Sequence, residues 1–554
     1  MSYKLGIDVG GTFTDAVLIN NNVVHNKGKI PTDKDNLLET IVNAMDLLDI
    51  SKQKIEQITI STTLVTNAIL QNRLPEVNLL LFPGSGMKLS SLPWPVNYEV
   101  LEGELDFRGR EVNPPNQQEW KQLVERLKSS LNPQIAISGK FSHRNNIYEE
   151  QLASYLQKEL PKADIALGSQ LGQTNFYRRS LTTYLNLASQ VQFLEFASQL
   201  KSAIDTRKCT APIRVLKADG GVLPLSKIRP VESIYSGPAA SVLGALAQSS
   251  SEDSYVVVDI GGTTTDIGLV LSGSPLISAQ GAKIGSFLTN VRSLAVRSVP
   301  VGGDSVVLME NNKLKLANYR LGPAFCIGGY NPTPTDALRY LNLTDYGSHA
   351  RAEESLASLL PESKRQPQDI RELAEEVVRI MVDRIGQAIE ELQQEWQDEP
   401  AYKVWEVLHH HEDLEFYIQL SGGGASGIAN ALADRMNART VLTDFSEVSN
   451  AIGAAMAKPT FSWTLNLDTY LGRYRIEETG EQGKWEGSKK PHREVEQFLK
   501  DLAYRQAETM GIEGSSLQKD QFDYFPLVES YNTVGQIIRG GMHVPPGVSG
   551  RIVK

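Results

Sequence analysis

Hydrophobic and polar positions follow one pattern twice along the chain: a short apolar run, a glycine turn, and a second apolar run. The first copy spans residues 7–19 and the second spans residues 258–271. Each apolar run has the length of a buried strand, so both copies are predicted to form strand, tight turn and strand. A single copy could be an ordinary hairpin whose turn happens to be Gly-Gly. Two copies in one chain indicate instead that the fold contains duplicated halves.

The two turns carry residues that are suited to binding phosphate. They read Asp8-Val9-Gly10-Gly11-Thr12-Phe13-Thr14-Asp15 and Asp259-Ile260-Gly261-Gly262-Thr263-Thr264-Thr265-Asp266. Paired glycines let a ligand approach closely, and successive backbone N–H groups form a concavity for phosphate oxygens. The threonine hydroxyls add donors. We therefore predict that one nucleotide lies between the two halves and contacts Gly10, Gly11, Thr12, Thr14, Gly261, Gly262, Thr263 and Thr264.

The aspartate that precedes each glycine pair has a different expected role. A carboxylate does not bind phosphate directly, but its oxygens are ligands that Mg²⁺ prefers. Asp8 and Asp259 are therefore predicted to hold Mg²⁺ or to orient a water molecule. The alternative is that both carboxylates only cap their turns. The predicted catalytic residues are Asp8, Thr12, Asp259 and Asp304.

Two further glycine turns extend the predicted site. Gly302 and Gly303, followed by Asp304, are compatible with another phosphate or ribose contact. A strand at 415–420 leads into the run 422–427, which matches G-x-G-x-x-G and has Asp444 about twenty residues further on. A separate dinucleotide site would need further βα units after this fingerprint, and little chain remains for them. We favour an adenosine contact by Gly422, Gly423 and Gly424.

The rest of the chain alternates strands and helices. Strands are predicted at 57–61, 77–82, 134–138 and 213–218, and helices at 35–48, 117–131, 147–160, 177–204 and 371–396. Small residues dominate helices that begin near 236 and near 450, and we expect these two helices to pack together as a hinge. Pro238 suits the first helical position, with Ser236 or Gly237 as the cap. Thr335 or Asp336 is expected to cap the helix that begins there.

Several potential ligands are interpreted as structural. His143 has no acidic partner in its vicinity in the sequence, so it is predicted to be a surface or satisfied core histidine. The run 409–411 consists of three histidines and is predicted to be a solvated loop, because consecutive side chains point in different directions and chelate one metal poorly. Cys326 is predicted to be a small buried hydrophobe.

Composition limits the class of protein. The chain has 554 residues, of which 41% are hydrophobic and 22% charged, as expected for a globular protein of two or three domains. A net charge of −10 argues against nucleic acid or an anionic membrane as partner. The chain has only two cysteines, no apolar run of membrane-spanning length, and an N-terminus that leads directly into a strand. We therefore expect a cytoplasmic protein without a signal peptide.

These motifs together resemble the hydantoinase/oxoprolinase family, and specifically its ATP-binding A subunit, within the actin, Hsp70 and sugar-kinase ATPase superfamily. Beyond the two glycine turns, the resemblance rests on Thr62-Thr63 through Thr66-Asn67-Ala68, Ser236-Gly237-Pro238-Ala239-Ala240, Gly322-Pro323-Ala324 with Cys326, and Pro332-Thr333-Pro334-Thr335-Asp336-Ala337. It covers about residues 1–457. Two departures are Gly302-Gly303-Asp304, where long members have a glycine-rich run, and a reduced C-terminal part.

The resemblance implies an α/β fold with two duplicated ribonuclease-H-like lobes around an ATP cleft, plus a small C-terminal α+β domain. The expected domains are residues 1–205, 206–457 and 458–554. The implied activity is hydrolysis, the ATP-dependent opening of a cyclic amide such as a hydantoin or 5-oxoproline, with Mg²⁺ and a second, B-type subunit. Two alternatives are a sugar or small-metabolite kinase and a non-catalytic nucleotide switch or activator ATPase.

Overall fold

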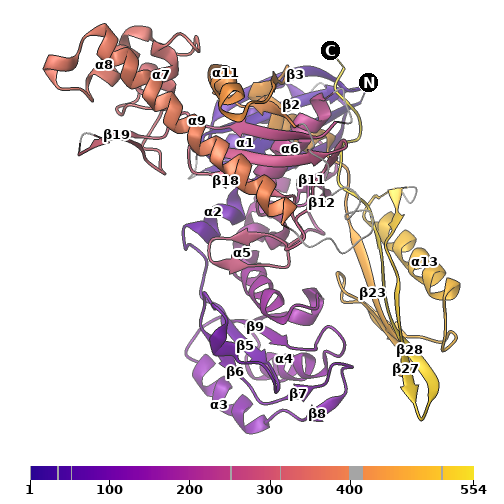
Figure 1. Ribbon diagram of the computed structural model, residues 1–554. Helices are drawn as coiled ribbons and strands as arrows, with labels where there is room; N and C mark the ends of the chain where they lie inside the picture. Colours follow the sequence, from indigo (N-terminus) through magenta and orange to yellow (C-terminus); the bar gives the residue numbers. More distant parts are fainter. Residues whose placement is uncertain are drawn as a thin grey trace.

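The computed structural model describes residues 2–33, 36–50, 53–171, 173–249, 253–311, 313–398, 416–512 and 516–553, and it shows a mixed α/β protein with several sheets (Figure 1). The predicted solvated loop at 409–411 lies outside these residues. In the part of the chain that the structure describes, no helix is both long enough and apolar enough to cross a membrane.

The first glycine turn joins two strands of a six-stranded sheet. Its strand order is β12-β11-β4-β1-β2-β3, in which β1 and β2 form an antiparallel hairpin and β4 runs parallel to β1. The strands are β1 (Tyr3–Val9), β2 (Phe13–Asn20), β3 (Val23–Pro31), β4 (Ile55–Thr62), β11 (Ile213–Leu216) and β12 (Val222–Pro224). One face is covered by α1 (Leu37–Leu47) and α5 (Phe176–Thr206). Burial on both faces explains the continuous apolar run of β1.

The second glycine turn joins the corresponding strands of another sheet. The order is β15-β14-β13-β21-β22, again with an antiparallel hairpin and a parallel neighbour, and β18 pairs with β14. Both predicted strand–turn–strand units are thus observed. The strands are β13 (Tyr255–Ile260), β14 (Thr265–Leu271), β15 (Ser274–Pro275), β18 (Val296–Val299), β21 (Tyr417–Ser421) and β22 (Thr440–Leu442).

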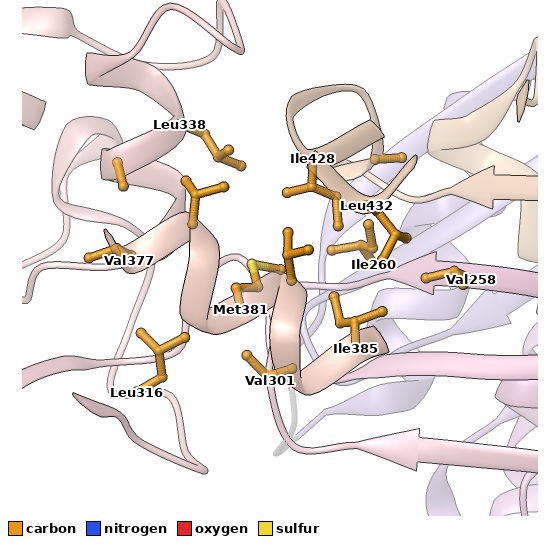
Figure 2. Packing of buried hydrophobic residues seen from close by; sticks show 14 of the residues in the cluster. Val258, Ile260, Val301, Leu316, Leu338, Val377, Met381, Ile385, Ile428 and Leu432 are labelled. Atoms are coloured by element: carbon orange, nitrogen blue, oxygen red, sulfur yellow. The ribbon is translucent and has the colours of Figure 1, made fainter. Parts of the chain in front are cut away.

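The core of this second sheet lies against α9 (Pro367–Gln397) and α11 (Ala425–Met436). Figure 2 shows Met381 and Ile385 of α9 facing Ile260 of β13 and Ile428 of α11. The helix predicted at 371–396 is therefore present, and it starts earlier than predicted. Pro367 occupies its first turn, and Gln366 forms a capping box with Asp369.

Two helices of small residues lie between the two sheets. Helix α6 (Ser236–Gln248) packs on β14, helix α12 (Ser449–Met456) packs on β1, and the two helices pack on each other. A Cβ added at Gly453 would lie 2.0 Å from the carbonyl oxygen of Ala240, and one added at Gly244 would lie 2.0 Å from that of Ser449. Glycine is required at both positions for this close approach, so the predicted packing of the two helices is confirmed.

Two predicted helix caps are wrong. Helix α6 begins at Ser236, and its cap is Tyr235 in the left-handed conformation, because the Ser236 hydroxyl bonds to Thr62 in the neighbouring sheet. Helix α7 (Pro334–Tyr340) is capped by Thr333, which forms a capping box with Asp336. Pro334 at the first helical position explains why the helix begins two residues earlier than predicted.

A further module follows α2 (Leu64–Leu70). Its four-stranded sheet of order β10-β9-β5-β6 is parallel, with α3 (Gln117–Leu127) and α4 (Ile147–Glu159) packed on it. The helices predicted at 117–131 and 147–160 are thus present. The strands are β5 (Asn78–Phe82), β6 (Tyr98–Val100), β9 (Gln134–Gly139) and β10 (Asp164–Leu167), beside the hairpin β7 (Glu104–Leu105) and β8 (Glu111–Asn113).

The C-terminal part forms one sheet with a helix on it. This sheet contacts the β5–β9 module, because Asp468 at the end of β23 pairs at 3.0 Å with Arg108, which lies between β7 and β8. Figure 1 shows the module and the C-terminal sheet at the same end of the molecule. Its main elements are β23 (Ser462–Asp468), β24 (Arg473–Ile476), β25 (Gln482–Lys484), β27 (Asp523–Glu529), β28 (Asn532–His543) and α13 (Arg493–Thr509). The predicted boundary at 205/206 remains a prediction, although β11 and β12 beyond it pair within the first sheet.

Candidate functional site

The two glycine turns, far apart in sequence, meet in space. The hydroxyl oxygens of Thr12 and Thr263 are 3.3 Å apart. Each turn is closed by the same backbone bond, from Gly10 N–H to the Phe13 carbonyl at 3.1 Å and from Gly261 N–H to the Thr264 carbonyl at 2.9 Å. The two copies of the motif therefore have the same local geometry and lie against each other.

Asp8 and Asp259 stand at the carboxyl ends of β1 and β13, and their surroundings differ. Asp259 accepts hydrogen bonds from the hydroxyls of Ser241 at 2.8 Å and Ser421 at 3.1 Å, and from the Asn450 side-chain amide at 3.0 Å. Asp8 is buried, and its Oδ1 has no hydrogen-bond partner among the residues that the structure describes. One carboxylate is thus held by three donors, and the other keeps an unused acceptor.

Burial and neighbouring acids raise the pKa of Asp8. Burial is the main cause, repulsion from Asp15 and Asp259 adds to it, and the hydrogen bond from Ser61 opposes it, which brings the pKa to about 7. Burial likewise raises the pKa of Asp266 to about 7, with Asp259 adding repulsion. Four aspartates from the two motif copies therefore interact in a region of low solvent access, and such perturbed acids are typical of functional sites.

Among the described residues, Asp15 is the one of these four acids that forms a salt bridge. Lys29 Nζ lies 2.7 Å from its carboxylate. Burial still raises the pKa of Asp15 to about 6, because the attraction of Lys29 offsets only part of the desolvation. Negative charge near the turns is therefore only partly neutralised by the protein itself.

Gly302 and Gly303 support the second turn. Gly303 N–H donates to the Gly261 carbonyl at 3.0 Å, Asp304 N–H donates to the Gly262 carbonyl at 2.8 Å, and Gly302 N–H donates to the Ser305 hydroxyl. A Cβ at Gly302 would lie 2.6 Å from the Gly261 carbonyl oxygen. The N–H groups of Gly302 and Gly303 already donate within the protein, so they are not available to a phosphate or a ribose. The predicted contact at 302–303 stays a prediction, and it would have to use atoms other than these two N–H groups.

Asp304 and Arg320 connect the second turn to the first. Arg320 Nε lies 3.0 Å from the Asp304 carboxylate, and its Nη1 donates to the Thr12 hydroxyl at 3.1 Å. Burial raises the pKa of Asp304 to about 6, and Arg320 acts in the opposite direction. The structure thus places Asp304 beside the turns, where it positions Arg320, and its predicted catalytic role stays a prediction.

The four threonines that were predicted to contact the nucleotide lie in three different settings. Thr12 and Thr263 point toward each other between the turns. Thr14 is buried in β2, and its hydroxyl bonds that of Thr32 at 2.9 Å. Thr264 belongs to the second turn through its carbonyl. The hydroxyls of Thr12 and Thr263 are therefore better placed than that of Thr14 to meet a ligand.

The third glycine run has one position that faces open space. Gly422 has φ +92°, and a Cβ there would lie 2.3 Å from the Ile260 carbonyl oxygen, so this turn packs directly on the end of β13. A Cβ at Gly424 would lie 3.0 Å from the Ile260 side chain. A Cβ at Gly423 would meet nothing within 4 Å among the described residues, and the same holds at Gly11. Both positions leave room for a ligand.

Sequence reasoning missed four side chains of this region. Ser241 and Asn450 lie in the small-residue helices α6 and α12, Ser421 directly precedes the glycine run, and Arg320 lies just before the Gly322-Pro323 motif. The first three lie in or beside motifs that were already recognised. Nothing in the local sequence distinguishes Arg320 from a surface arginine.

The geometry defines a protein with two facing glycine turns whose aspartates converge, and comparison with known families agrees with this class. The hydantoinase/oxoprolinase model matches residues 179–462, and the model of the hydantoinase/oxoprolinase N-terminal region matches residues 4–160. The chain belongs to the hydantoinase/oxoprolinase family, which confirms the resemblance seen in its motifs.

Relatives of known name cover much of the chain. The caprolactamase subunit alpha of Pseudomonas jessenii is 24% identical over 60% of this chain and 54% of its own length. The acetophenone carboxylase gamma subunit of Aromatoleum aromaticum is 24% identical over 69% of this chain and 59% of its own. The 5-oxoprolinase of Saccharomyces cerevisiae is 22% identical over 65% of this chain and 29% of its own. The chain therefore spans less than two thirds of each of these three relatives.

Two solved structures share the fold. The nucleotide-free structure of acetone carboxylase superposes with a TM-score of 0.71 at 15% identity and covers 99% of this chain and 88% of its own. The ATP-dependent caprolactamase of Pseudomonas jessenii superposes with a TM-score of 0.69 at 18% identity and covers 98% of this chain and 87% of its own. At these identities the likeness establishes the fold.

Proposed function

We propose that this chain is an ATP-dependent enzyme of the hydantoinase/oxoprolinase type that activates the carbonyl of a cyclic amide. The two sheets would act as duplicated ribonuclease-H-like lobes, and ATP would bind between them. The observation that carries this proposal is the approach of Thr12 and Thr263 to 3.3 Å, because it brings two phosphate-type glycine turns to one place. ATP dependence is named for both acetone carboxylase and caprolactamase, which share the fold.

The residues near the turns fit a bound Mg²⁺. Among the described residues no group of three His, Cys, Asp or Glu side chains is arranged to hold a metal. Mg²⁺ usually takes only one or two carboxylates, together with waters and phosphate oxygens. Asp8, with its unpartnered Oδ1, and Asp259 would supply the carboxylates. When bound, the ion would offset the charge of the phosphates and of the surrounding aspartates.

The protein's own groups would position the nucleotide and exclude competing interactions. Gly11 and Gly262 would present backbone donors to the phosphates, and Thr12 and Thr263 would add hydroxyls from opposite sides. Gly423 would lie against the adenosine. In phosphoryl transfer most catalysis comes from such positioning and from charge stabilisation. Arg320, which bonds both Thr12 and Asp304, would keep the first turn in place.

Phosphorylation gives a chemical reason for using ATP on a cyclic amide. An amide carbonyl is a poor electrophile. Transfer of the terminal phosphoryl group of ATP to its oxygen releases ADP and makes the carbon electrophilic enough for water to add. Departure of the ring nitrogen, which takes a proton, then breaks the C–N bond and opens the ring, and a second water hydrolyses the resulting acyl phosphate to the carboxylate and inorganic phosphate. Relatives named caprolactamase and 5-oxoprolinase support this substrate class. A ketone is the second candidate, favoured by the similarity to acetophenone carboxylase and acetone carboxylase.

A second subunit is part of the proposal. Two of the relatives are named as subunits, one alpha and one gamma. The described residues near the turns include no nucleophile–base pair of the kind that would complete hydrolysis. We therefore expect weak or no lactam hydrolysis from the isolated chain, and stoichiometric lactam opening by the purified chain alone would contradict this.

A coupled ATPase screen over lactams, hydantoins, ketones and sugars tests the activity. With the second subunit added, the expected result is release of inorganic phosphate that requires a lactam or hydantoin, and that is lost in Asp8→Asn but kept in the matched surface variant Asp205→Asn. Release that requires a ketone would select the second candidate. A stable phosphorylated sugar would identify a kinase instead, and turnover that responds only to a protein would identify a switch.

A further inference from the structure

A cationic cavity lies away from the glycine turns. Its volume is about 260 Å³, and none of its lining residues belongs to the turns. It is bounded on one side by the β7–β8 loop and the segment after β9, and on the other by strands β23, β24 and β25 of the C-terminal sheet. The cavity is therefore formed where the β5–β9 module meets the C-terminal sheet.

Positive charge dominates the lining. Five lining side chains are cationic and one is a carboxylate: Arg108, Arg144, Arg473, Arg475, Lys484 and Asp468. Asp468 is already paired with Arg108 at 3.0 Å. Behind the lining, Glu149 accepts hydrogen bonds from the N–H groups of Gly139 and Ser169, and Glu477 bonds Asn466 and Arg539. In a chain of net charge −10, this local excess of cations is an exception that calls for an anionic partner.

Buried polar groups at this cavity lack partners. His143 is 4% exposed, and its Nδ1 has no partner among the described residues. Arg475 is 3% exposed; its Nη atoms donate to Gln482 and to the Ser169 carbonyl, and its Nε has no partner in the same part of the chain. Among the residues that the structure describes, the Arg144 guanidinium makes no side-chain hydrogen bond or salt bridge. Native proteins rarely leave buried polar groups unsatisfied, and such groups mark a missing water, ion or ligand. His143 is therefore a core histidine, as one of the two predicted alternatives has it, but the described residues do not satisfy its Nδ1, and the surface alternative is wrong.

The pKa of His143 reflects the positive charge around the cavity. Burial, which is the larger cause, and the positive charges of the neighbouring Arg179, Arg144, Arg475 and Arg539 together lower the pKa of His143 to about 2. The ring is thus neutral at physiological pH and surrounded by cations. An anion placed among these arginines would reverse part of this effect.

We propose that this cavity is a binding site for a small carboxylate- or phosphate-bearing anion, held by Arg144, Arg475 and Lys484 across the contact between the two modules. Guanidinium groups pair with both kinds of oxyanion through charge-assisted hydrogen bonds. The volume lies near the lower end of small-molecule sites, about 300 Å³, so the ligand is compact. A bound anion would tie the β5–β9 module to the C-terminal sheet.

Isothermal titration calorimetry of the full chain with inorganic phosphate and, separately, with succinate tests the proposal. We expect saturable binding of at least one of them, weakened about tenfold or more in Arg144→Met, as for loss of a charged hydrogen bond. Arg126→Met removes an exposed arginine from the same module and should bind like wild type. Binding of phosphate alone or succinate alone identifies which oxyanion the site takes. No saturable binding of either ligand overturns the proposal.

Two further measurements separate this site from the glycine turns and from folding defects. Thr12→Val should keep the binding, and phosphate binding that is lost in Thr12→Val but kept in Arg144→Met would overturn the proposal. If Arg144→Met does not fold, substitution of the exposed Lys484 by Met should still weaken anion binding. An affinity of Lys484→Met equal to that of wild type would contradict the proposal. The ligand should also shift the imidazole NMR signals of His143 at neutral pH, and an unchanged His143 signal at saturation would count against the site.

Discussion

Replacing Asp8 by Asn should stabilise the free protein while it removes activity. The carboxylate is buried beside Asp15 and Asp259, and its pKa is raised from 3.8 to about 7. A group whose pKa is higher in the folded state binds its proton more tightly there. The free energy of unfolding therefore falls as the pH rises from about 4 to 7, and the contribution of Asp8 to it stays constant above pH 7. A shift of this size corresponds to about 4 kcal/mol at pH 8, an upper limit for the gain in Asp8→Asn.

The pH dependence is the sharper part of this prediction. About 3 kcal/mol of the stability that wild type loses through Asp8 is lost between pH 5 and pH 8. The difference in free energy of unfolding between Asp8→Asn and wild type should therefore grow across that range. Differential scanning calorimetry of the nucleotide-free proteins in EDTA measures it, with the exposed Asp205→Asn as matched control. The control should melt with wild type at every pH. Turnover of Asp8→Asn should fall by about 10² or more, because the variant lacks the carboxylate that would hold Mg²⁺. The positive charge of that ion would offset the charge of the phosphates in the transition state.

The opposite pattern would refute the reasoning. If Asp8 only caps its turn, Asn should lower the melting temperature by the amount expected for a lost cap, about 1 kcal/mol, at every pH. Turnover would then stay within about threefold of wild type, well short of the loss expected for an electrostatic contact. A variant that is both less stable and active would therefore exclude a functional role for this carboxylate.

Three further predictions concern the same site. Gly262→Ala should lower turnover and ATP affinity, because its Cβ would lie 2.7 Å from Asp304 Oδ2 and 3.1 Å from the Thr12 hydroxyl, and wild-type kinetics would contradict this. Gly423→Val should weaken ATP binding in calorimetry, because it fills open space at the proposed adenosine contact; tight NAD binding without ATP binding by wild type would favour the dinucleotide alternative. Small-angle scattering should show a smaller radius of gyration with Mg-ATP, and an unchanged value with nucleotide bound would exclude closure of the lobes.

Local patterns were sufficient to predict most elements of the fold. The two strand–turn–strand units, the helices near 117, 147 and 371, and the packing of α6 on α12 follow from apolar periodicity and from small residues. Helix caps failed where tertiary contacts intervene: the Ser236 hydroxyl bonds to Thr62, 174 residues away, instead of capping its own helix. Propensity describes the isolated segment, and a distant partner can override it.

At the candidate site, too, local motifs could be predicted from the sequence and contacts with distant segments could not. The motif repeat placed Asp8, Thr12 and Thr263 in one region, and the structure shows the two threonines in contact. Arg320 could not be found in this way, because it meets Thr12 across 308 residues of sequence. The core position of His143 was one of the predicted alternatives, but its cationic surroundings could not be found from the sequence, since they include Arg475 and Arg539 of the C-terminal sheet. Burial and charge supplied by distant segments are not visible in a local window.

Calorimetric titration of the chain with a non-hydrolysable ATP analogue and Mg²⁺ tests most directly whether the two turns share one nucleotide. We expect one site per chain, with affinity reduced by a substitution in either turn, Gly11→Val in the first or Gly262→Val in the second. A Cβ at Gly11 meets open space, so this variant probes the ligand more than the fold. Two sites per chain, or an affinity that Gly11→Val leaves unchanged, would contradict the account.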